Sequence, residues 1–173
     1  EQQGAREAMV FLQSYGIPAT LAVKISKLYG DRTALVIREN PYRLCEDLDG
    51  VGFLTADRIG SALGVAQDSE GRIVSALKYI LKETAVSMGH IYLPRNELIA
   101  RAAQLLRVDA ALVEHHLMRL CLLRELVLSG EDDAQRVYLP AFDSAEREVA
   151  TRLCELMAAL PASRAPGAER EID

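Results

Sequence analysis

The sequence lacks the surplus of positive charge that a dedicated nucleic-acid-binding protein usually carries. It holds 25 acidic and 20 basic residues among 173, which gives a formal net charge of −5 at pH 7 and an isoelectric point of about 5.3. This balance excludes a globally positive surface. Any contact with a nucleic acid must be local, made by backbone N–H groups and a few Lys or Arg side chains.

Long apolar runs are also absent. No stretch is long enough to cross a bilayer, and Glu1–Gly4 lacks the basic segment and apolar stretch of a signal peptide. Three cysteines, Cys45, Cys121 and Cys154, are scattered without a CxxC spacing, which indicates reduced thiols rather than a disulfide framework or a metal site. We therefore expect a cytoplasmic protein that does not contact a membrane.

Patterns of catalytic residues are missing as well. The sequence has no GxxxxGK[ST] loop for the phosphates of ATP, and no Ser-His-Asp or Cys-His order for a nucleophile and its base. His115 and His116 are adjacent, whereas two metal ligands on one helix need a spacing of three or four residues. We expect no enzymatic activity, no metal and no cofactor in this chain.

Half of the residues are apolar, enough to bury a core, and their spacing predicts a mainly α-helical chain. In residues 5–67, a helix, a glycine-containing hairpin and a second helix occur twice, with about 35 residues between the two hairpins. The first hairpin contains Gly16 and precedes a helix over 18–29, and the second contains Gly50 and Gly52. This tandem helix-hairpin-helix unit is the first predicted domain.

Residues 68–143 are the second predicted domain, in which helices alternate with short strands. The expected order is helix, strand, helix, helix and a small β-hairpin, which is the order of a winged helix. These elements are expected at 70–87, 90–94, 95–106, 109–121, 125–128 and 136–139. Residues 144–173 are interpreted as a last helix, capped by Ser144 and running to about residue 160, followed by a linker.

The second hairpin is the most informative local feature. Two glycines flank one apolar residue, Val51, and a helix begins directly afterwards. The glycines allow the backbone to turn tightly and to approach a phosphate, whose oxygens the free N–H groups of the helix start can bind with help from the helix dipole. Such contacts ignore base identity, so the hairpin predicts binding of the sugar–phosphate backbone of DNA without sequence preference.

The candidate DNA-binding residues fall into two sets. The second hairpin offers Gly50, Val51, Gly52, Phe53, Thr55 and Arg58. The first hairpin offers Gly16, Ile17, Lys24 and Lys27. The first has only one glycine, and Pro18 removes one donor, so it can equally be a structural partner. The second can also be a plain tight turn, and Asp47, Asp49 and Asp57 weaken its positive field.

The predicted winged-helix region is a weaker candidate for DNA binding. Its third helix, 109–120, combines Arg119 with Asp109 and Glu114, and the tip of its hairpin is the acidic run 131–133. These charges disfavour contact with phosphates and favour packing against another domain or a protein partner.

With these residues laid out, the chain resembles the N-terminal region of long RecD-like (RecD/TraA family) ATP-dependent DNA helicases. The resemblance extends over about residues 5–160 and rests on short segments. They are Tyr15-Gly16-Ile17, Glu39-Asn40-Pro41-Tyr42-Arg43-Leu44, Leu48-Asp49-Gly50-Val51-Gly52-Phe53-Leu54-Thr55-Ala56-Asp57, Gly89-His90-Ile91-Tyr92-Leu93-Pro94 and Val137-Tyr138-Leu139-Pro140.

This resemblance implies a longer bacterial protein of DNA repair or recombination. Its motor, two RecA-like domains that hydrolyse ATP with Mg²⁺ and move 5′ to 3′ on single-stranded DNA, would follow this chain and be its intramolecular partner. The ATPase residues of the family have no counterpart here. Only the hairpin residues are carried over as DNA contacts.

Three hypotheses compete. The leading one is a non-catalytic DNA-binding accessory module of a RecD-like 5′–3′ helicase, whose partner is single-stranded DNA or a single-/double-strand junction. The alternative is a protein-interaction or intramolecular scaffold module that docks on the motor without touching DNA, which Pro18 and the acidic hairpin tip favour. The third is a glycosylase or nuclease, which needs a poised Asp or Lys; Asp68 fits better as a cap of the following helix.

Overall fold

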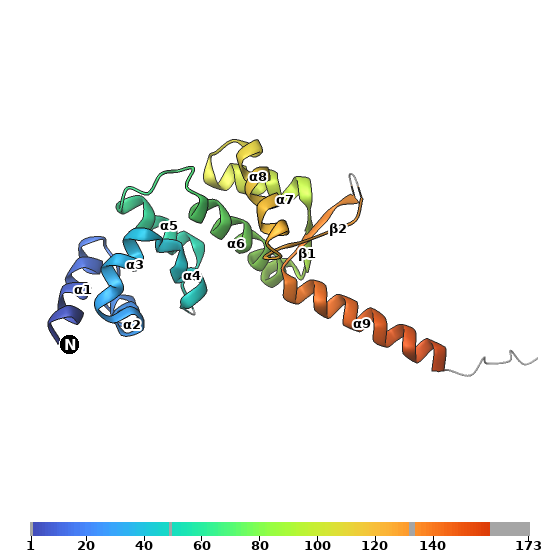
Figure 1. The fold of residues 1–173 in the computed structure, drawn as a ribbon, viewed down its shortest axis with the longest axis horizontal. Helices are drawn as coiled ribbons and strands as arrows, with labels where there is room; N and C mark the ends of the chain where they lie inside the picture. The colour runs from blue at the N-terminus through green and yellow to red at the C-terminus, as the bar shows by residue number, and fades with distance from the viewer. Residues whose placement is uncertain (1, 49, 132–133, 160–173) are drawn as a thin grey trace, which may run out of the picture.

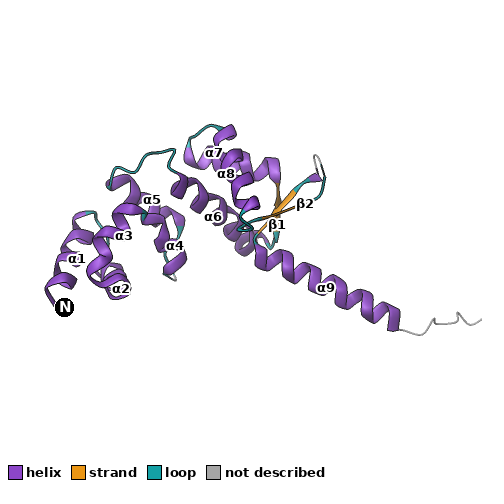
Figure 2. Ribbon diagram, viewed as in Figure 1, coloured by secondary structure: helices purple, strands orange, loops and turns teal. Residues whose placement is uncertain are grey.

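The fold is mainly α-helical with one small antiparallel sheet, as the sequence predicts (Figure 2). The computed structural model describes residues 2–48, 50–131 and 134–159. Figure 1 shows an elongated molecule, with the N-terminal helices at one end, the sheet further along, and the last helix extending away at the other end. A tandem helix-hairpin-helix unit is thus followed by a winged-helix-like unit with a small β-hairpin.

The tandem unit consists of short helices joined by tight turns. Its elements are α1 (Gln2–Ser14), α2 (Ala19–Tyr29), a 3₁₀ turn (Gly30–Arg32), α3 (Thr33–Glu39), a second 3₁₀ turn (Pro41–Arg43), α4 (Leu44–Asp47) and α5 (Phe53–Ala62). Asn40 ends α3, because the residue before a proline disfavours the helical conformation. Its side-chain oxygen then accepts a hydrogen bond from the amide of Tyr42 at 3.0 Å, which begins the second 3₁₀ turn.

The winged-helix-like unit has the expected order of elements. It comprises α6 (Glu70–Met88), β1 (Tyr92–Pro94), α7 (Arg95–Leu106), α8 (Ala110–Leu122), β2 (Val127–Ser129) and β3 (Arg136–Tyr138). The strands form an antiparallel sheet in the order β1-β3-β2, with Val137 opposite both Leu93 and Leu128. Two expected helix ends are confirmed: Gly89 ends α6 at a φ of +72°, and the Asp109 side chain accepts the amide of Ala111 at 2.9 Å.

Two clusters of buried side chains hold the fold together, and α5 belongs to both. The first joins the two hairpin units and includes Val51 and Ile59. The second fills the space between α6, α7, α8 and the sheet, and it includes Phe53 and Ala56. The second hairpin is therefore held between the two units rather than at the free end of one.

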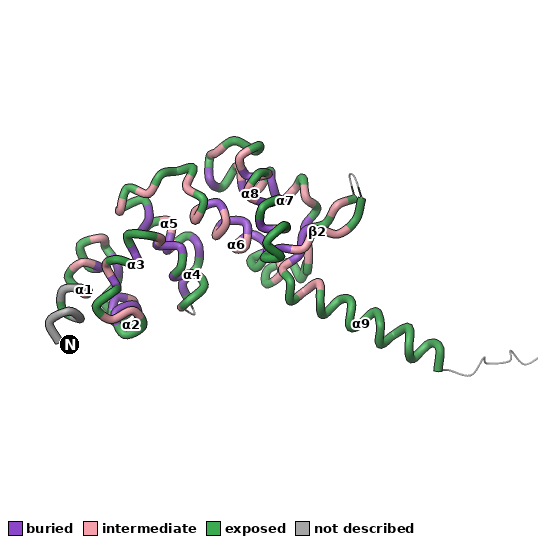
Figure 3. Tube along the Cα trace, viewed as in Figure 1, coloured by how far each residue is buried: buried purple, intermediate pink, exposed green. Residues whose placement is uncertain are grey.

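The last helix, α9 (Pro140–Ala159), begins earlier than expected, so the predicted cap at Ser144 is wrong. Proline suits the first turn of a helix, where its missing N–H has no intrahelical partner. Only Leu139 separates α9 from β3. From Ser144 to Ala159 every residue is exposed, as Figure 3 shows. None of the helices of residues 2–48, 50–131 and 134–159 is long and apolar enough to span a membrane.

Candidate nucleic-acid interface

The two hairpins have the same local structure, and each position of the first matches the position 34 residues later in the second. Gly16 and Gly50 both have positive φ angles, +71° and +85°. The apolar residues that follow them, Ile17 and Val51, are both buried. Further along, the matched pairs Ala22/Ala56 and Ile25/Ile59 are buried too. The internal repeat that the sequence predicts is therefore a structural repeat.

The two glycines of the second hairpin have different roles. The backbone conformation at position 50 requires a glycine, because a φ of +85° is strained for any L residue with a Cβ. Gly52 has an ordinary extended backbone, with φ −86° and ψ 167°, and a Cβ built there would meet no atom within 4 Å. Neither backbone strain nor internal packing therefore requires glycine at position 52. Its missing side chain leaves open space directly in front of α5.

The start of α5 faces that open space with unused donors. The first helical hydrogen bonds come from the amides of Thr55 and Ala56, both to the carbonyl of Gly52. The amides of Phe53 and Leu54 donate to no other described residue, and no side chain caps the helix. Such uncovered N–H groups, together with the positive end of the helix dipole, form an arrangement that can bind an oxyanion.

The first hairpin differs at this point. Pro18 occupies the position that Gly52 occupies in the second hairpin, directly before α2, and proline has no N–H to donate. Lys24 matches Arg58 in the repeat, and both side chains are exposed, as is Lys27. Basic side chains therefore accompany both hairpins, but the second has the more complete set of backbone donors.

Two of the carboxylates expected to weaken the field of the second hairpin are bound by other side chains. Asp47 accepts a hydrogen bond of 2.7 Å from the hydroxyl of Tyr29 and lies 3.6 Å from Arg43 Nε. Asp57 lies on the side of α5 that packs against α6, where Arg72 binds it. Asp49, the third, lies outside the described residues. The repulsion between these carboxylates and a phosphate is therefore weaker than the sequence indicates.

Asp57, Arg72 and Tyr42 form a hydrogen-bonded cluster that fixes α5 against α6. Arg72 Nε and Nη2 donate to the two Asp57 oxygens at 2.7 and 3.0 Å, and the Tyr42 hydroxyl donates to Asp57 at 2.8 Å. Arg72 Nη1 also donates to the carbonyls of Gln67 and Leu106, at 2.9 and 3.0 Å. This bidentate, partly buried ion pair ties the second hairpin helix to the winged-helix-like unit.

The cluster also shifts the pKa values of its members. Burial opposes ionisation of Asp57, but the hydrogen bonds from Arg72 and Tyr42 outweigh it and hold the pKa of this carboxyl below its usual value. Burial and the hydrogen bond to Asp57 raise the pKa of the Tyr42 hydroxyl well above its usual value. The cluster is therefore a charged carboxylate held by a cation and a neutral phenol.

Burial limits what the predicted contact residues can do. The side chains of Ile17, Val51 and Phe53 are buried, so only their backbone atoms can contact DNA. Thr55 is half-buried, and Arg58 is exposed. The Phe53 ring instead lies 6.0 Å from the Tyr42 ring and 5.7 Å from the Tyr79 ring, measured between centroids. These aromatic contacts make the loop in front of α5 rigid from the inside.

Two lysines of α6 lie beside the second hairpin, and the sequence did not single them out. Lys78 and Lys82 line a small hollow together with Val51, Gly52 and Phe53. Their spacing of four residues places them on one side of the helix. The apolar spacing of the sequence indicates which side of this helix is buried, but not which elements lie next to its polar side. No sequence signal indicated which charged residues of α6 would lie next to the hairpin.

Two arginines of the winged-helix-like unit are paired with carboxylates. Arg119 Nη1 lies 2.6 Å from a Glu70 oxygen, and Arg95 pairs with Glu114. The exposed side of α8 instead carries Ala111, His115, Met118 and Leu122. This mostly apolar side favours contact with protein over contact with phosphates. Of the acidic hairpin tip, Asp132 and Asp133 lie outside the described residues.

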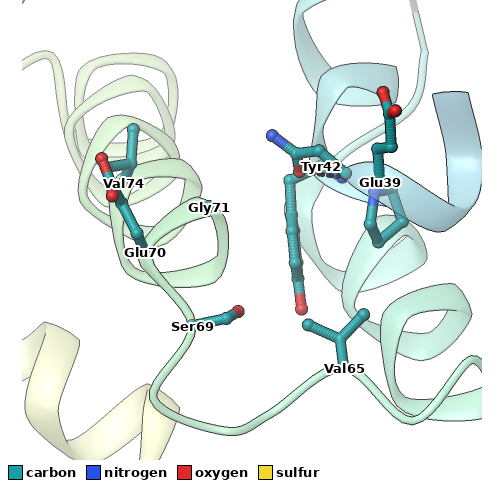
Figure 4. Close-up of a pocket in the computed structure, with 9 residues that line it drawn as sticks. Glu39, Tyr42, Val65, Ser69, Glu70, Gly71 and Val74 are labelled. Atoms are coloured by element: carbon teal, nitrogen blue, oxygen red, sulfur yellow. Dashed lines mark hydrogen bonds between the residues drawn. The ribbon is translucent and has the colours of Figure 1, made fainter.

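A second hollow lies between the 3₁₀ turn at Pro41–Arg43 and the start of α6 (Figure 4). The Tyr42 ring, Val65 and Ser69 face one another there, and Glu39 and Glu70 lie on opposite sides. Two carboxylates make this hollow unsuitable for a phosphate. Within the part of the chain that the structure describes, no group of three or more His, Cys, Asp and Glu residues could hold a metal ion.

Comparison with known proteins identifies a family of helix-hairpin-helix domains. A family model described as the HHH domain of the ATP-dependent RecD2 DNA helicase matches residues 1–92. This range contains both hairpins and the whole of α6.

One similar curated protein is the ATP-dependent RecD2 DNA helicase of Deinococcus radiodurans. It is 30% identical to this chain over 177 aligned residues. The match covers 95% of this chain but only 24% of the relative, so the chain spans about a quarter of that relative's length.

Proposed function

The chain belongs to the family of HHH domains of ATP-dependent RecD2 DNA helicases, and from this membership we propose that it is a non-catalytic accessory module that binds DNA through its second hairpin. In this proposal the amides at the start of α5 bind one phosphate, and Gly52 leaves room for it. The observation that carries the proposal is the set of uncovered amides of Phe53 and Leu54 opposite the open space at Gly52. Arg58, exposed one turn further along α5, adds its charge.

The binding is proposed to be independent of sequence and sensitive to salt. Backbone amides and Arg58 reach phosphates rather than base edges, so they carry no information about the bases. The net charge of −5 opposes approach to DNA, which makes the isolated chain a weak binder. We propose single-stranded DNA or a single-/double-strand junction as the partner.

The remainder of a longer protein is proposed to supply the activity. The name of the Deinococcus relative describes an ATP-dependent DNA helicase, and three quarters of that relative lies outside the match. We propose that this chain serves such a motor, which would hydrolyse ATP with Mg²⁺ and move 5′ to 3′ in DNA repair or recombination. On this proposal the motor is its intramolecular partner, in the cytoplasm of a bacterial cell.

A second function is favoured by the exposed apolar side chains of α9. Val149, Leu153, Leu156 and Met157 are all more than half exposed. Leu153, Leu156 and Met157 follow Val149 by four, seven and eight residues, which places all four along one side of the helix. Such a side favours docking on protein, so a scaffold module that holds the motor without touching DNA is the alternative.

Fluorescence anisotropy with labelled single-stranded, duplex and forked DNA tests the two functions. The unmodified chain is compared with Gly52→Glu, which places a negative charge in front of α5 without requiring a strained backbone. Gln104→Glu, at an exposed position of α7, adds the same charge away from the hairpins and serves as the matched control. We expect the chain and the control to bind at low salt and Gly52→Glu not to bind.

Absence of binding by the unmodified chain in all three DNA forms at low salt would contradict the DNA-binding proposal. That result would leave the scaffold function, and the α9 side chains would then be the first to substitute. Circular dichroism of each variant shows whether it has kept the helical fold.

A further inference from the structure

The small hollow beside the second hairpin brings three elements together. Val51, Gly52 and Phe53 form one side, Cys45 and Glu46 of α4 a second, and Ser75, Lys78, Tyr79 and Lys82 of α6 the third. Its volume is about 70 Å³, far below the several hundred Å³ of a site for a small organic ligand. A surface of this size suits a single charged group that approaches from outside, and Gly52 is one of the residues that line it.

The two lysines of this hollow have different environments. Lys78 is held by two carboxylates, with its Nζ 2.7 Å from Glu46 Oε1 and 2.8 Å from Glu125 Oε2. Its side chain is only 22% exposed. Lys78 therefore ties α4, which precedes the hairpin, to α6 and to the segment after α8. The positive charge of Lys78 is neutralised by these two carboxylates.

Lys82 lies one helical turn further along α6 and is exposed. It forms no ion pair with any residue in the described ranges. Its charge nevertheless reaches the hollow: burial raises the pKa of the Cys45 thiol, and the positive charge of Lys82 is among the groups that oppose this rise. A cation without an ion pair among the described residues thus lines the same hollow as Gly52, the residue directly before the uncovered amides of α5.

We propose that Lys82 is a second phosphate contact, which binds the phosphate next to the one held by α5 on the same DNA strand. The inference rests on the proposed function, because it requires that DNA reaches the second hairpin. Lys78 is a positioning residue that keeps the hairpin beside Lys82. A flexible lysine suits this role, because a compact ammonium group can follow a phosphate whose position varies with the DNA sequence and form.

The consequence is that the binding surface does not end with the tandem unit. A DNA strand would run from α5 onto the outer side of α6. The buried side of the same helix contributes to the core of the winged-helix-like unit. Because Lys82 touches only phosphate in this arrangement, its removal weakens binding equally for all sequences and lowers the salt dependence.

The test measures the dissociation constant of the full chain for labelled DNA at several salt concentrations. For Lys82→Ala we expect the slope of log K against log [salt] to fall by about 0.9 on duplex DNA and about 0.7 on single-stranded DNA. Lys82→Arg keeps the charge and should restore the slope. Arg152→Ala removes an exposed cation from α9 and should leave the slope unchanged.

The outcomes separate the inference from the function on which it rests. If the unmodified chain binds and Lys82→Ala has its slope and affinity, Lys82 is an ordinary solvated lysine and the inference is wrong, while the function of the hairpin stands. If Arg152→Ala lowers the slope as much as Lys82→Ala does, only net charge matters and the inference is again wrong. If the unmodified chain does not bind DNA, both the function and the inference are wrong.

Discussion

Alanine at position 50 should lower the stability of the chain, whereas alanine at position 52 should lower its affinity for DNA. At Gly50 the φ of +85° forces an added Cβ into a strained conformation, which costs about 1–2 kcal/mol. For a chain of this size, that loss lowers the melting temperature by about 2–8 °C. At Gly52 the backbone is extended and nothing lies within 4 Å of an added Cβ. The loss of a glycine N-cap, about 0.5 kcal/mol, is offset by a similar loss of entropy in the unfolded chain, so stability should hardly change.

The affinity for DNA should be affected at position 52 rather than at position 50. A methyl group at position 52 lies where a phosphate would approach the amides of Phe53 and Leu54. Loss of one such contact should weaken DNA binding about tenfold, equivalent to ~1.4 kcal/mol, with little change in the salt slope, because a backbone amide carries no net charge. Gly52→Ala should therefore be a stable protein that binds poorly.

Thermal denaturation by circular dichroism and anisotropy titrations on the same preparations measure the two effects. Gly64→Ala is the matched control, because Gly64 also has a positive φ, +75°, in open space, but at the far end of α5. It should lose stability as Gly50→Ala does and still bind DNA once folded. The reasoning is refuted if Gly52→Ala binds as tightly as the unmodified chain, or if its melting temperature falls as far as that of Gly50→Ala.

Four further substitutions test three other features. Arg72 and Tyr42 lower the pKa of Asp57, so this carboxylate adds stability that is present above its ordinary pKa of about 4 and is lost as the pH falls through the lower folded-state value. Asp57→Asn should thus lower the melting temperature at pH 7 and reduce its decline between about pH 5 and pH 2; an unchanged decline would contradict this role. Arg107→Gly and Arg124→Gly relieve positive φ angles of +58° and +59°, and calorimetry should show each raising the melting temperature by about 1–2 °C. Pro18→Gly supplies the amide that the first hairpin lacks and should lower the dissociation constant for DNA in anisotropy titrations, whereas an unchanged dissociation constant would argue against the first hairpin as a phosphate site.

Local features of this fold could be predicted from the sequence. The turns at Gly16 and Gly50 follow from residues that are adjacent in the chain, because a positive φ and a buried apolar neighbour leave a short, readable pattern. The cap at Asp109 and the end of α6 at Gly89 are local in the same way. The predicted start of α9 at Ser144 is wrong. Serine is a favoured N-cap residue, but Pro140, directly after β3, already fits the first turn of the helix.

Contacts between distant segments could not be predicted. The ion pair of Asp57 and Arg72 joins two helices whose apolar spacing says nothing about their polar sides. Asp57 was interpreted as a charge that weakens the hairpin, yet it faces α6 and is held by Arg72. The same limit applies to Lys82, since its place beside Gly52 depends on how α5 packs on α6. Phe53 was chosen as a DNA contact, but its ring is part of the core that α5 shares with α6.

The junction of β3 and α9 has a mechanical consequence. Only Leu139 lies between them, and its carbonyl accepts the amides of Phe142 and Asp143 at 3.0 and 3.2 Å, so strand and helix change direction together. A helix of 20 residues is about 30 Å long, so a tilt of about 10° at Pro140 moves Ala159 by about 5 Å. Any change in the direction of β3 would therefore displace the far end of α9 much more than its start.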